Sequence, residues 1–144
     1  MELIRSPRLS STAEYAYAAT APADARFVFL AGACPLNADG TTAAKGDYAG
    51  QAQACIDNMI TALDDAGATI EDVINTRVLV ASSNRSDLVA AWSVVRDAFG
   101  THDVPSTLLG VTALGYDDQL VEIEAVAAIP EPIGRTARSR PSGS

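Results

Sequence analysis

Two carboxylates near the end of the chain are the residues best suited to chemistry. Glu122 and Glu124 lie in the stretch LVEIEAVA, where apolar residues separate them. Successive side chains of a strand point to opposite faces, so both glutamates share one face while Val121 and Ile123 share the other. On so apolar a strand, the acidic face lines a cleft or a polar interface as readily as it faces solvent. A carboxylate in a cleft can handle a proton or a water molecule.

The segments around this strand predict an α+β fold. Strand patterns cover residues 2–4, 15–20, 26–31, 73–81, 106–114 and 120–127. Apolar stripes at helical spacing predict one helix over 48–66, capped by Asp47, and a second from a cap at Ser86 or Asp87 to Phe99. We expect the segments 15–20 and 26–31 to form one hairpin, and 106–114 and 120–127 to form an antiparallel hairpin.

This order of elements most simply packs both helices on one face of a mixed sheet, in two layers. The other face would then expose apolar side chains, among them Leu79, Leu120 and Val126. So large an uncovered patch favours self-association, and we expect a closed homo-oligomer.

Length and charge narrow the class of protein. The 144 residues suit a single domain, which we place at 1–130, and the Pro-, Gly-, Ser- and Arg-rich residues 131–144 are predicted to be a disordered tail. A net charge of −8 disfavours nucleic acid and anionic membranes as partners. No apolar run is long enough for a membrane span and no secretory signal is evident, so we expect a cytoplasmic protein. Cys34 and Cys55 lack metal-ligand spacing, so no metal site is expected.

Several features together resemble the Rid family of reactive intermediate deaminases, also called the YjgF family. They are the apolar strand ending at Gly32 with Pro35 just beyond, Asn58 in the first helix, the Pro105 entry and the VEIEA ending, within residues 13–128. The resemblance implies a chorismate-mutase-like fold and a homotrimer. Its sheets would face inward around a central barrel, with ligand clefts between subunits, in agreement with the uncovered sheet face.

The resemblance also implies a chemistry. Active Rid deaminases hydrolyse small imines or enamines to keto acids and ammonia without a metal or an organic cofactor, and their glutamate falls at Glu122, where it would activate water. The arginine that holds the substrate carboxylate falls at Thr107. A threonine hydroxyl offers one neutral hydrogen bond in place of a bidentate ionic grip, so we expect altered specificity. Backbone amides near Gly32 and Thr107 would polarise the reacting group.

Among the remaining cleft positions, two differ from the family pattern and one agrees with it. Ala31 stands where the family has a small hydroxyl residue, Tyr15 matches a cleft tyrosine, and Trp92 replaces a residue that is sometimes polar. Two classes of function stay open. The first is a small-molecule imine hydrolase; the second is a non-catalytic trimer that binds a more apolar metabolite between Leu108, Trp92 and Tyr15. RNA cleavage, associated with some relatives, is a weaker third reading that the acidic charge opposes.

Three further residues have simpler interpretations. Arg77 shares a strand face with Glu124, so it is expected either to pair with Glu124 or to replace the missing anchor. Cys34 is expected to be an inert loop thiol near the mouth of the cleft, because no nearby cation would lower its pKa. His102, just past a helix, is predicted to be a surface residue rather than a catalytic base.

Overall fold

The computed structural model describes residues 1–130, and the predicted tail at 131–144 lies outside the described residues. The chain forms, in order, β1 (Glu2–Ile4), β2 (Ala18–Thr20), β3 (Arg26–Phe29), α1 (Tyr48–Asp65), a 3₁₀ turn (Ile70–Asp72), β4 (Val73–Val80), α2 (Arg85–Phe99), β5 (Ser106–Gly110) and β6 (Val121–Ile129).

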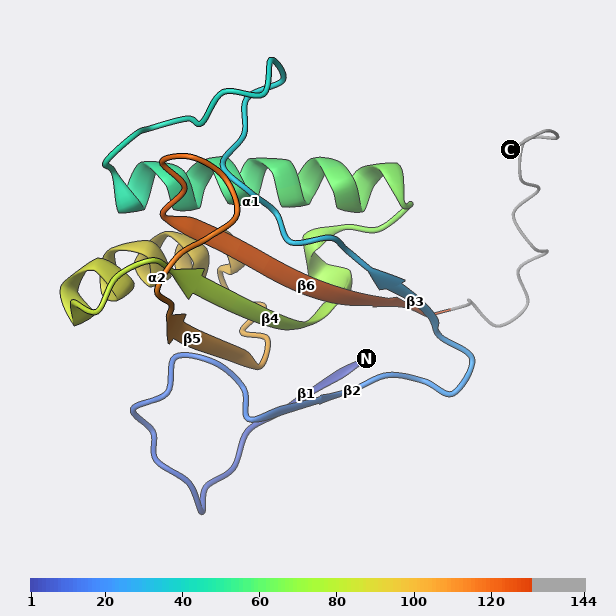
Figure 1. The fold of residues 1–144 in the computed structure, drawn as a ribbon. Coiled ribbons are helices and arrows are strands. Elements are labelled where there is room, and N and C mark those ends of the chain that lie inside the picture. Colours follow the sequence, from blue (N-terminus) through green and yellow to red (C-terminus); the bar gives the residue numbers. More distant parts are fainter. Residues whose placement is uncertain (131–144) are drawn as a thin grey trace, which may run out of the picture.

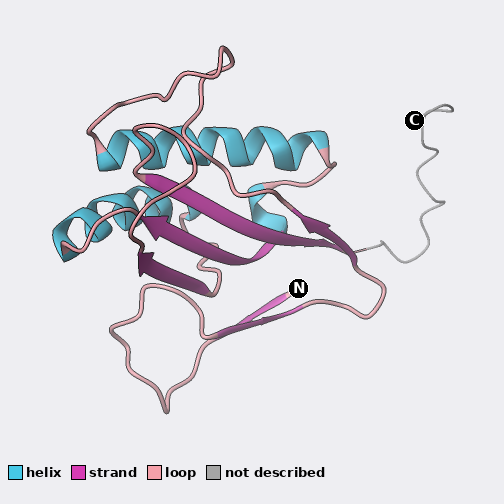
Figure 2. Ribbon diagram, viewed as in Figure 1, coloured by secondary structure: helices cyan, strands magenta, loops and turns pink. Residues whose placement is uncertain are grey.

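The main sheet has four strands in the order β3-β6-β4-β5, and both helices pack on one of its faces (Figure 1). The last strand, β6, pairs antiparallel with β3 on one side and with β4 on the other, whereas β5 runs parallel to β4. Strands β1 and β2 form a separate two-stranded ribbon beside this sheet (Figure 2). The predicted two-layer α+β architecture is confirmed.

The predicted C-terminal hairpin is wrong. β5 ends at Gly110 and lies at the sheet edge, and β4 separates it from β6. The segment β4-α2-β5 is a crossover, in which a helix carries the chain back so that two strands run parallel. β6 takes the central position because its residues Val121, Ile123, Ala125 and Ala127 are all buried against the helices. The loop at Gly115–Asp118 thus leads to a strand two places away.

The predicted N-terminal hairpin is also wrong. β2 is shorter than expected, beginning at Ala18, and it pairs with β1 in a register that sets Glu2 opposite Thr20. β3 instead pairs with β6, with Phe29 opposite Val126. The turn between β2 and β3 therefore connects two sheets, and Tyr15 lies in the loop before β2.

The two helices differ in how well their sequence patterns predict them. Asp47 caps α1 as expected, accepting a hydrogen bond from the Gly50 amide at 3.0 Å. The apolar stripe that predicts α1 comprises Ala52, Cys55, Ile56, Met59, Ile60 and Leu63. All of these residues are buried except Ile60, which is 44% exposed, so its place in the stripe is wrong. In α2 the predicted cap at Ser86 or Asp87 is wrong. The cap is Asn84, two residues before Ser86, and its side chain accepts from the Ser86 amide at 3.1 Å.

The sheet face away from the helices stays uncovered by residues 1–130 at β3 and β5. Phe29 is 77% exposed and Phe27 52% exposed, with their rings 6.3 Å apart, and Leu109 is also exposed. Exposed aromatic side chains on a strand form the kind of apolar patch that marks an interface. Within the described chain, no helix has both the length and the apolar character needed to cross a membrane.

Candidate active site

The Glu122 carboxylate lies on the uncovered sheet face, at the start of β6. Its Oε1 atom accepts two hydrogen bonds, from the Cys34 thiol at 3.1 Å and from the Gln119 side-chain amide at 3.3 Å. Gln119 is itself buried and held, because its side-chain oxygen accepts from the Tyr116 amide at 3.1 Å. No cation pairs with Glu122 among residues 1–130. The carboxylate is oriented by neutral donors.

Gly32 supports the second oxygen of this carboxylate. A Cβ atom at this position would lie 2.6 Å from Oε2 and 2.8 Å from the carboxylate carbon of Glu122. Distances this short are steric clashes, so any side chain here would push the carboxylate away. Glycine is required at position 32 for this close approach, which is the role that a strand-end glycine often has.

Cys34 is held against Glu122 by the loop that follows β3. The Asn58 side chain of α1 donates to the Cys34 carbonyl at 2.8 Å and to the Leu36 carbonyl at 3.0 Å. Burial, with the hydrogen bond and charge of Glu122, raises the pKa of the Cys34 thiol to about 11. The thiol is thus protonated at neutral pH and is a donor to Glu122 rather than a nucleophile. We call the four residues Gly32, Cys34, Gln119 and Glu122 the carboxylate half.

A pocket of about 310 Å³ opens at the free edge of β5. Its lining residues, which we call the pocket half, are Tyr15, Trp92, Ser106, Thr107 and Leu108. The Tyr15 and Trp92 rings meet edge to face, 5.8 Å apart at 89°, so they form an aromatic corner. None of the five lining side chains is charged, and Ser106, Thr107 and Tyr15 carry hydroxyl groups.

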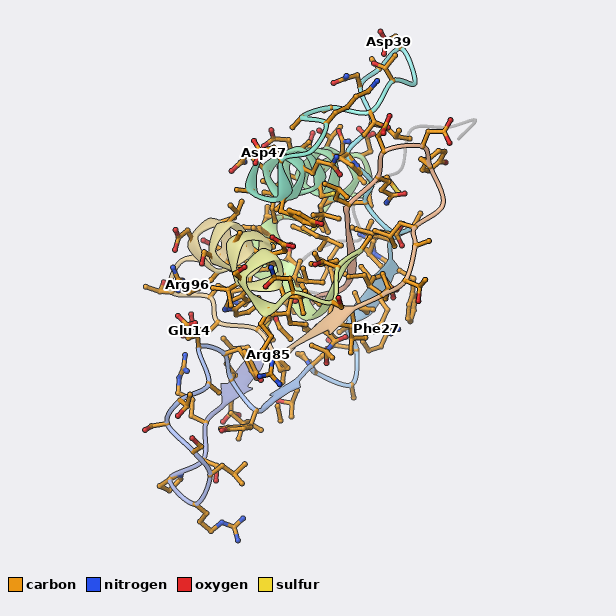
Figure 3. The ribbon with its side chains drawn as sticks, turned by 60° about the vertical axis from the view of Figure 1, so that its left-hand side comes forward. Glu14, Phe27, Asp39, Asp47, Arg85 and Arg96 are labelled. Carbon is orange, nitrogen blue, oxygen red and sulfur yellow. The ribbon has the colours of Figure 1, made fainter. Side chains whose placement is uncertain are left out.

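An ion pair attaches the N-terminal segment, and Tyr15 with it, to this pocket. Glu14 accepts hydrogen bonds from Arg96 at 2.6 Å and from the Trp92 indole at 3.2 Å, and Figure 3 shows Glu14 and Arg96 side by side. The hydrogen bond from Arg96 lowers the pKa of Glu14. A smaller cavity of about 10 Å³ lies beneath these residues. The aromatic corner therefore depends on a surface tether.

Within one chain the two halves lie apart. Thr107 on β5 lies opposite Arg77 on β4, Arg77 lies opposite Glu124 on β6, and Glu122 is two residues further along. With strands about 4.8 Å apart and about 3.3 Å per residue, the Cα atoms of Thr107 and Glu122 are roughly 12 Å apart. The predicted site residues thus divide into two groups, with Gly32 and Glu122 in one and Tyr15, Trp92, Thr107 and Leu108 in the other. Ala31 precedes Gly32 in the chain and is exposed.

An ion pair with Glu124 was the first of the two alternatives predicted for Arg77, and the geometry agrees with it. Its guanidinium lies 3.6 Å from the Glu124 carboxylate, and both side chains are nearly half exposed. Arg77 also lies directly beside Thr107 in the sheet register, the position where a carboxylate anchor is missing. The ion pair is present, and a role as anchor stays a prediction.

His102 is not the surface residue that its position predicted. It is half-buried, with its ring 6.4 Å from Phe99 and stacked on it, and its Nε2 atom hydrogen-bonds the Val73 carbonyl at 2.8 Å. It lies on the helix side of the sheet, away from both halves. Among residues 1–130 no group of His, Cys, Asp or Glu side chains is placed to hold a metal ion.

Sequence reasoning missed the link between Cys34 and Glu122. Residues 32 and 34 of an extended segment point to the same side, so a thiol two residues after Gly32 should reach whatever packs on that glycine. Gln119 and Glu14 were missed for another reason. Gln119 lies only three residues before Glu122, but its contact depends on the course of the loop that leads into β6, and Glu14 acts over 82 residues on Arg96.

Comparison with known proteins identifies the class. A family model described as Endoribonuclease L-PSP matches residues 6–129. The chain belongs to this family, which is also called the Rid or YjgF family, and it has the chorismate-mutase-like fold of two helices on a mixed sheet.

Individual relatives are similar at moderate identity. A RutC family protein of Pyrococcus abyssi is 31% identical over 101 residues, which cover 70% of this chain and 77% of the relative. Among solved structures, the Rid family protein YyfB of Yersinia pestis, described as of unknown function, has a TM-score of 0.79 at 26% identity, covering 89% of this chain and 98% of its own. Rv2704 of Mycobacterium tuberculosis, described as a YjgF/YER057c/UK114 family member, has a TM-score of 0.61 at 30% identity, with coverages of 89% and 98%.

Proposed function

We propose that this protein is a Rid-like hydrolase of small imines or enamines that needs no cofactor and uses Glu122 to activate water. The observation that carries this proposal is the state of the Glu122 carboxylate. It faces the uncovered side of the sheet, has no cationic partner within residues 1–130, and is oriented by two neutral donors on a single oxygen. A carboxylate that is oriented but not neutralised is suited to taking a proton from water.

The reaction balances without a metal or a redox partner. Glu122 takes a proton from water as the water oxygen bonds to the imine carbon, and the C=N electron pair moves to nitrogen, which takes this proton from Glu122. Glu122 then takes the hydroxyl proton of the resulting carbinolamine and passes it to the amino group, so that the C–N bond breaks, ammonia leaves, the C–O bond becomes a carbonyl and Glu122 is a carboxylate again. Backbone amides near Gly32 and Thr107 are the groups we assign to polarise the reacting atoms.

We infer that the working site forms between copies in a homotrimer. Roughly 12 Å separates the carboxylate half from the pocket half in one chain, on the strand spacing of the sheet, which is too far for one small substrate to touch both. An interface on the uncovered face would cover Phe27 and Phe29 and would bring one copy's carboxylate half to another's pocket half. Such a cleft agrees with the family resemblance.

The pocket half favours an uncharged, partly aromatic substrate. Its walls are Tyr15, Trp92 and Leu108, and its polar groups include the hydroxyls of Ser106, Thr107 and Tyr15. Arg96 and Arg77, the nearest guanidinium groups, are paired with Glu14 and Glu124. A free carboxylate on the substrate would meet no unpaired cation among these groups, so we expect weak binding of small imino acids.

One observation favours the alternative function, a non-catalytic protein that binds small molecules. The aromatic corner of Tyr15 and Trp92 resembles the apolar walls of ligand sites that lack chemistry. RNA cleavage is less supported, because a net charge of −8 would repel a polyanion.

Ammonia release from freshly generated imines tests the proposal. We would compare 2-iminopropionate with a bulkier apolar imine on the wild type, Glu122→Gln and Glu124→Gln. Hydrolysis by the wild type, lost in Glu122→Gln and kept in the same-strand control Glu124→Gln, is the expected result. If the wild type releases no ammonia from either imine, the proposal is overturned in favour of the binding function. Equal activity of Glu122→Gln and the wild type would remove Glu122 from the mechanism.

A further inference from the structure

The contact between Cys34 and Glu122 joins two segments that are 88 residues apart in sequence. The thiol is partly buried and lies 3.1 Å from Oε1, within the range for a hydrogen bond to sulfur. Its alternative acceptor, the Gly32 carbonyl, is further away at 3.5 Å. The thiol proton therefore has its best acceptor in the carboxylate.

The surrounding structure holds this thiol in place. Asn58 on α1 binds the carbonyls of Cys34 and Leu36, and Pro35 between them is buried. The Ala33 amide donates to the Ile123 carbonyl at 2.7 Å, which ties the same loop to β6 beside Glu122. A loop fixed on both sides can orient its neighbour, because its own side chains lose little entropy when they form the contact.

The two oxygens of the carboxylate have different surroundings. Oε1 accepts from Cys34 and Gln119, whereas Oε2 lies over Gly32 and accepts no hydrogen bond from residues 1–130. Both donors are uncharged, so they orient the carboxylate without neutralising it. An oxygen that accepts no hydrogen bond from the protein keeps its lone pairs free for a water molecule.

We propose that Cys34 is a positioning residue, whose thiol works with the Gln119 amide to hold Oε1 of Glu122 so that Oε2 takes the proton from water. This inference rests on the proposed hydrolysis, since it assigns Cys34 a part in that reaction. It goes beyond the expectation of an inert loop thiol. The thiol forms no bond to substrate and acts only as a hydrogen-bond donor.

The protonation of the thiol agrees with this role. Its pKa of about 11 keeps the donor proton in place through the neutral range. The other titratable group near this pair is Cys55 on α1, whose pKa burial raises. Arg77 and Glu124 lie opposite each other in the sheet, two residues along β6 from Glu122, and they neutralise each other. Nothing charged among these groups competes for Oε1.

Kinetics of three full-length variants test the role. Cys34→Ala removes the donor and should lower kcat about tenfold with KM changed less than about twofold, because one hydrogen bond to a charged group is lost from the reacting geometry. Cys34→Ser restores a donor and should recover most of kcat. Cys55→Ala removes the other cysteine, which does not touch the carboxylate, and should retain wild-type kcat. A merely structural cysteine would not show rescue by serine.

A measurement independent of activity tests the contact itself. In the Cys55→Ala background, Cys34 is the single cysteine, and its rate of alkylation by iodoacetamide reports its thiolate fraction. Adding Glu122→Gln removes the negative charge that raises the thiol pKa, so alkylation should accelerate roughly threefold to tenfold. An unchanged rate would overturn the contact, and with it the proposal.

The outcomes separate this inference from the proposed function. If the wild type hydrolyses imines and Glu122→Gln does not, but Cys34→Ala keeps wild-type kcat, the positioning role alone is overturned. If the wild type hydrolyses no imine, both the function and the role are overturned, even where alkylation shows the contact. A fall in kcat that serine repairs supports both.

Discussion

The carboxylate half and the pocket half of the proposed cleft are held in place in different ways. Glu122 lies on the central strand β6, packs on Gly32 and accepts hydrogen bonds from two partly or fully buried residues. The pocket half lies at the sheet edge on β5, and its aromatic corner is tied down by the exposed pair of Glu14 and Arg96. One half is therefore built into the core and the other is attached to the surface.

This difference indicates which features of the site can vary. A carboxylate supported by backbone and by buried side chains cannot move without disturbing the sheet. A group that takes part in a reaction needs such a fixed position. A pocket wall made from a terminal segment and a sheet edge can change its residues with little effect on folding. We therefore expect the water-activating group to be insensitive to surface changes, and substrate preference to be set by the pocket half.

The first prediction concerns the assembly that would bring the two halves together. Phe29→Asp places a charge on the 77% exposed aromatic of the uncovered face, where the proposed interface would bury it unpaired. We expect the proposed trimer to dissociate to monomers, measured by light scattering, and the proposed hydrolysis to fall below detection, measured by ammonia release. Val89→Asp, on the exposed side of α2, is the matched control and should leave the assembly intact. A Phe29→Asp trimer with full activity would show that this face is not the interface.

The second prediction concerns a substitution within the carboxylate half. Gly32→Ala introduces a Cβ atom 2.6 Å from Glu122 Oε2, so the carboxylate must move. We expect kcat to fall about a hundredfold, because a displacement of about 1 Å can cost that much. Gly115→Ala is the control, since a Cβ atom there would meet nothing within 4 Å. Near wild-type kcat in Gly32→Ala would mean that the position of this carboxylate is not critical.

The third prediction changes the specificity of the pocket half. Thr107→Arg supplies a bidentate partner for a substrate carboxylate. We expect small keto acids to bind about tenfold to a hundredfold more tightly, corresponding to about 1 to 3 kcal/mol. Titration calorimetry measures the change, and Thr112→Arg, an exposed threonine outside the pocket, controls for added positive charge. Equal affinity in both variants would show that position 107 does not control carboxylate binding.

The fourth and smallest effect concerns the tether of the pocket half. The hydrogen bond from Arg96 lowers the pKa of Glu14 below its ordinary 4.5, so its contribution to stability is present above that value and is lost as pH falls through the lower folded-state pKa. Glu14→Gln should therefore lower the melting temperature slightly at pH 7 and have no effect near pH 2. Glu71→Gln, exposed and on the 3₁₀ turn, is the control. A difference that persists at pH 2 would contradict the ion-pair explanation.

The confirmed parts of the fold are those that depend on local pattern. The alternation in β6, the cap at Asp47 and the stripe of α1 follow from periodicities that one segment carries by itself. Strand pairing is different, because it depends on which partner offers the best buried surface. Both predicted hairpins were wrong for this reason, although the helix between β4 and β5 was a usable signal for parallel pairing.

The candidate site divides in the same way. Glu122 and Gly32 could be selected from the VEIEA ending and the strand-end glycine, and the absence of an arginine at Thr107 could be read directly. The sequence does not predict that Cys34 and Gln119 bind the same oxygen of Glu122, since each of these contacts depends on the final course of a loop. The tether of Glu14 to Arg96 likewise joins segments whose proximity no local pattern records.

The sequence by itself determined the residue types and their periodicity: two glutamates on one face of an apolar strand, two amphipathic helices and a neutral residue at position 107. Tertiary structure alone decided that β6 is central and that Tyr15 and Trp92 lie in a different half from Glu122. The physical reason is the separation along the chain over which each effect acts. Periodicity arises from the geometry of neighbouring residues, whereas strand order and side-chain encounters arise from burying the most apolar surface across the whole chain.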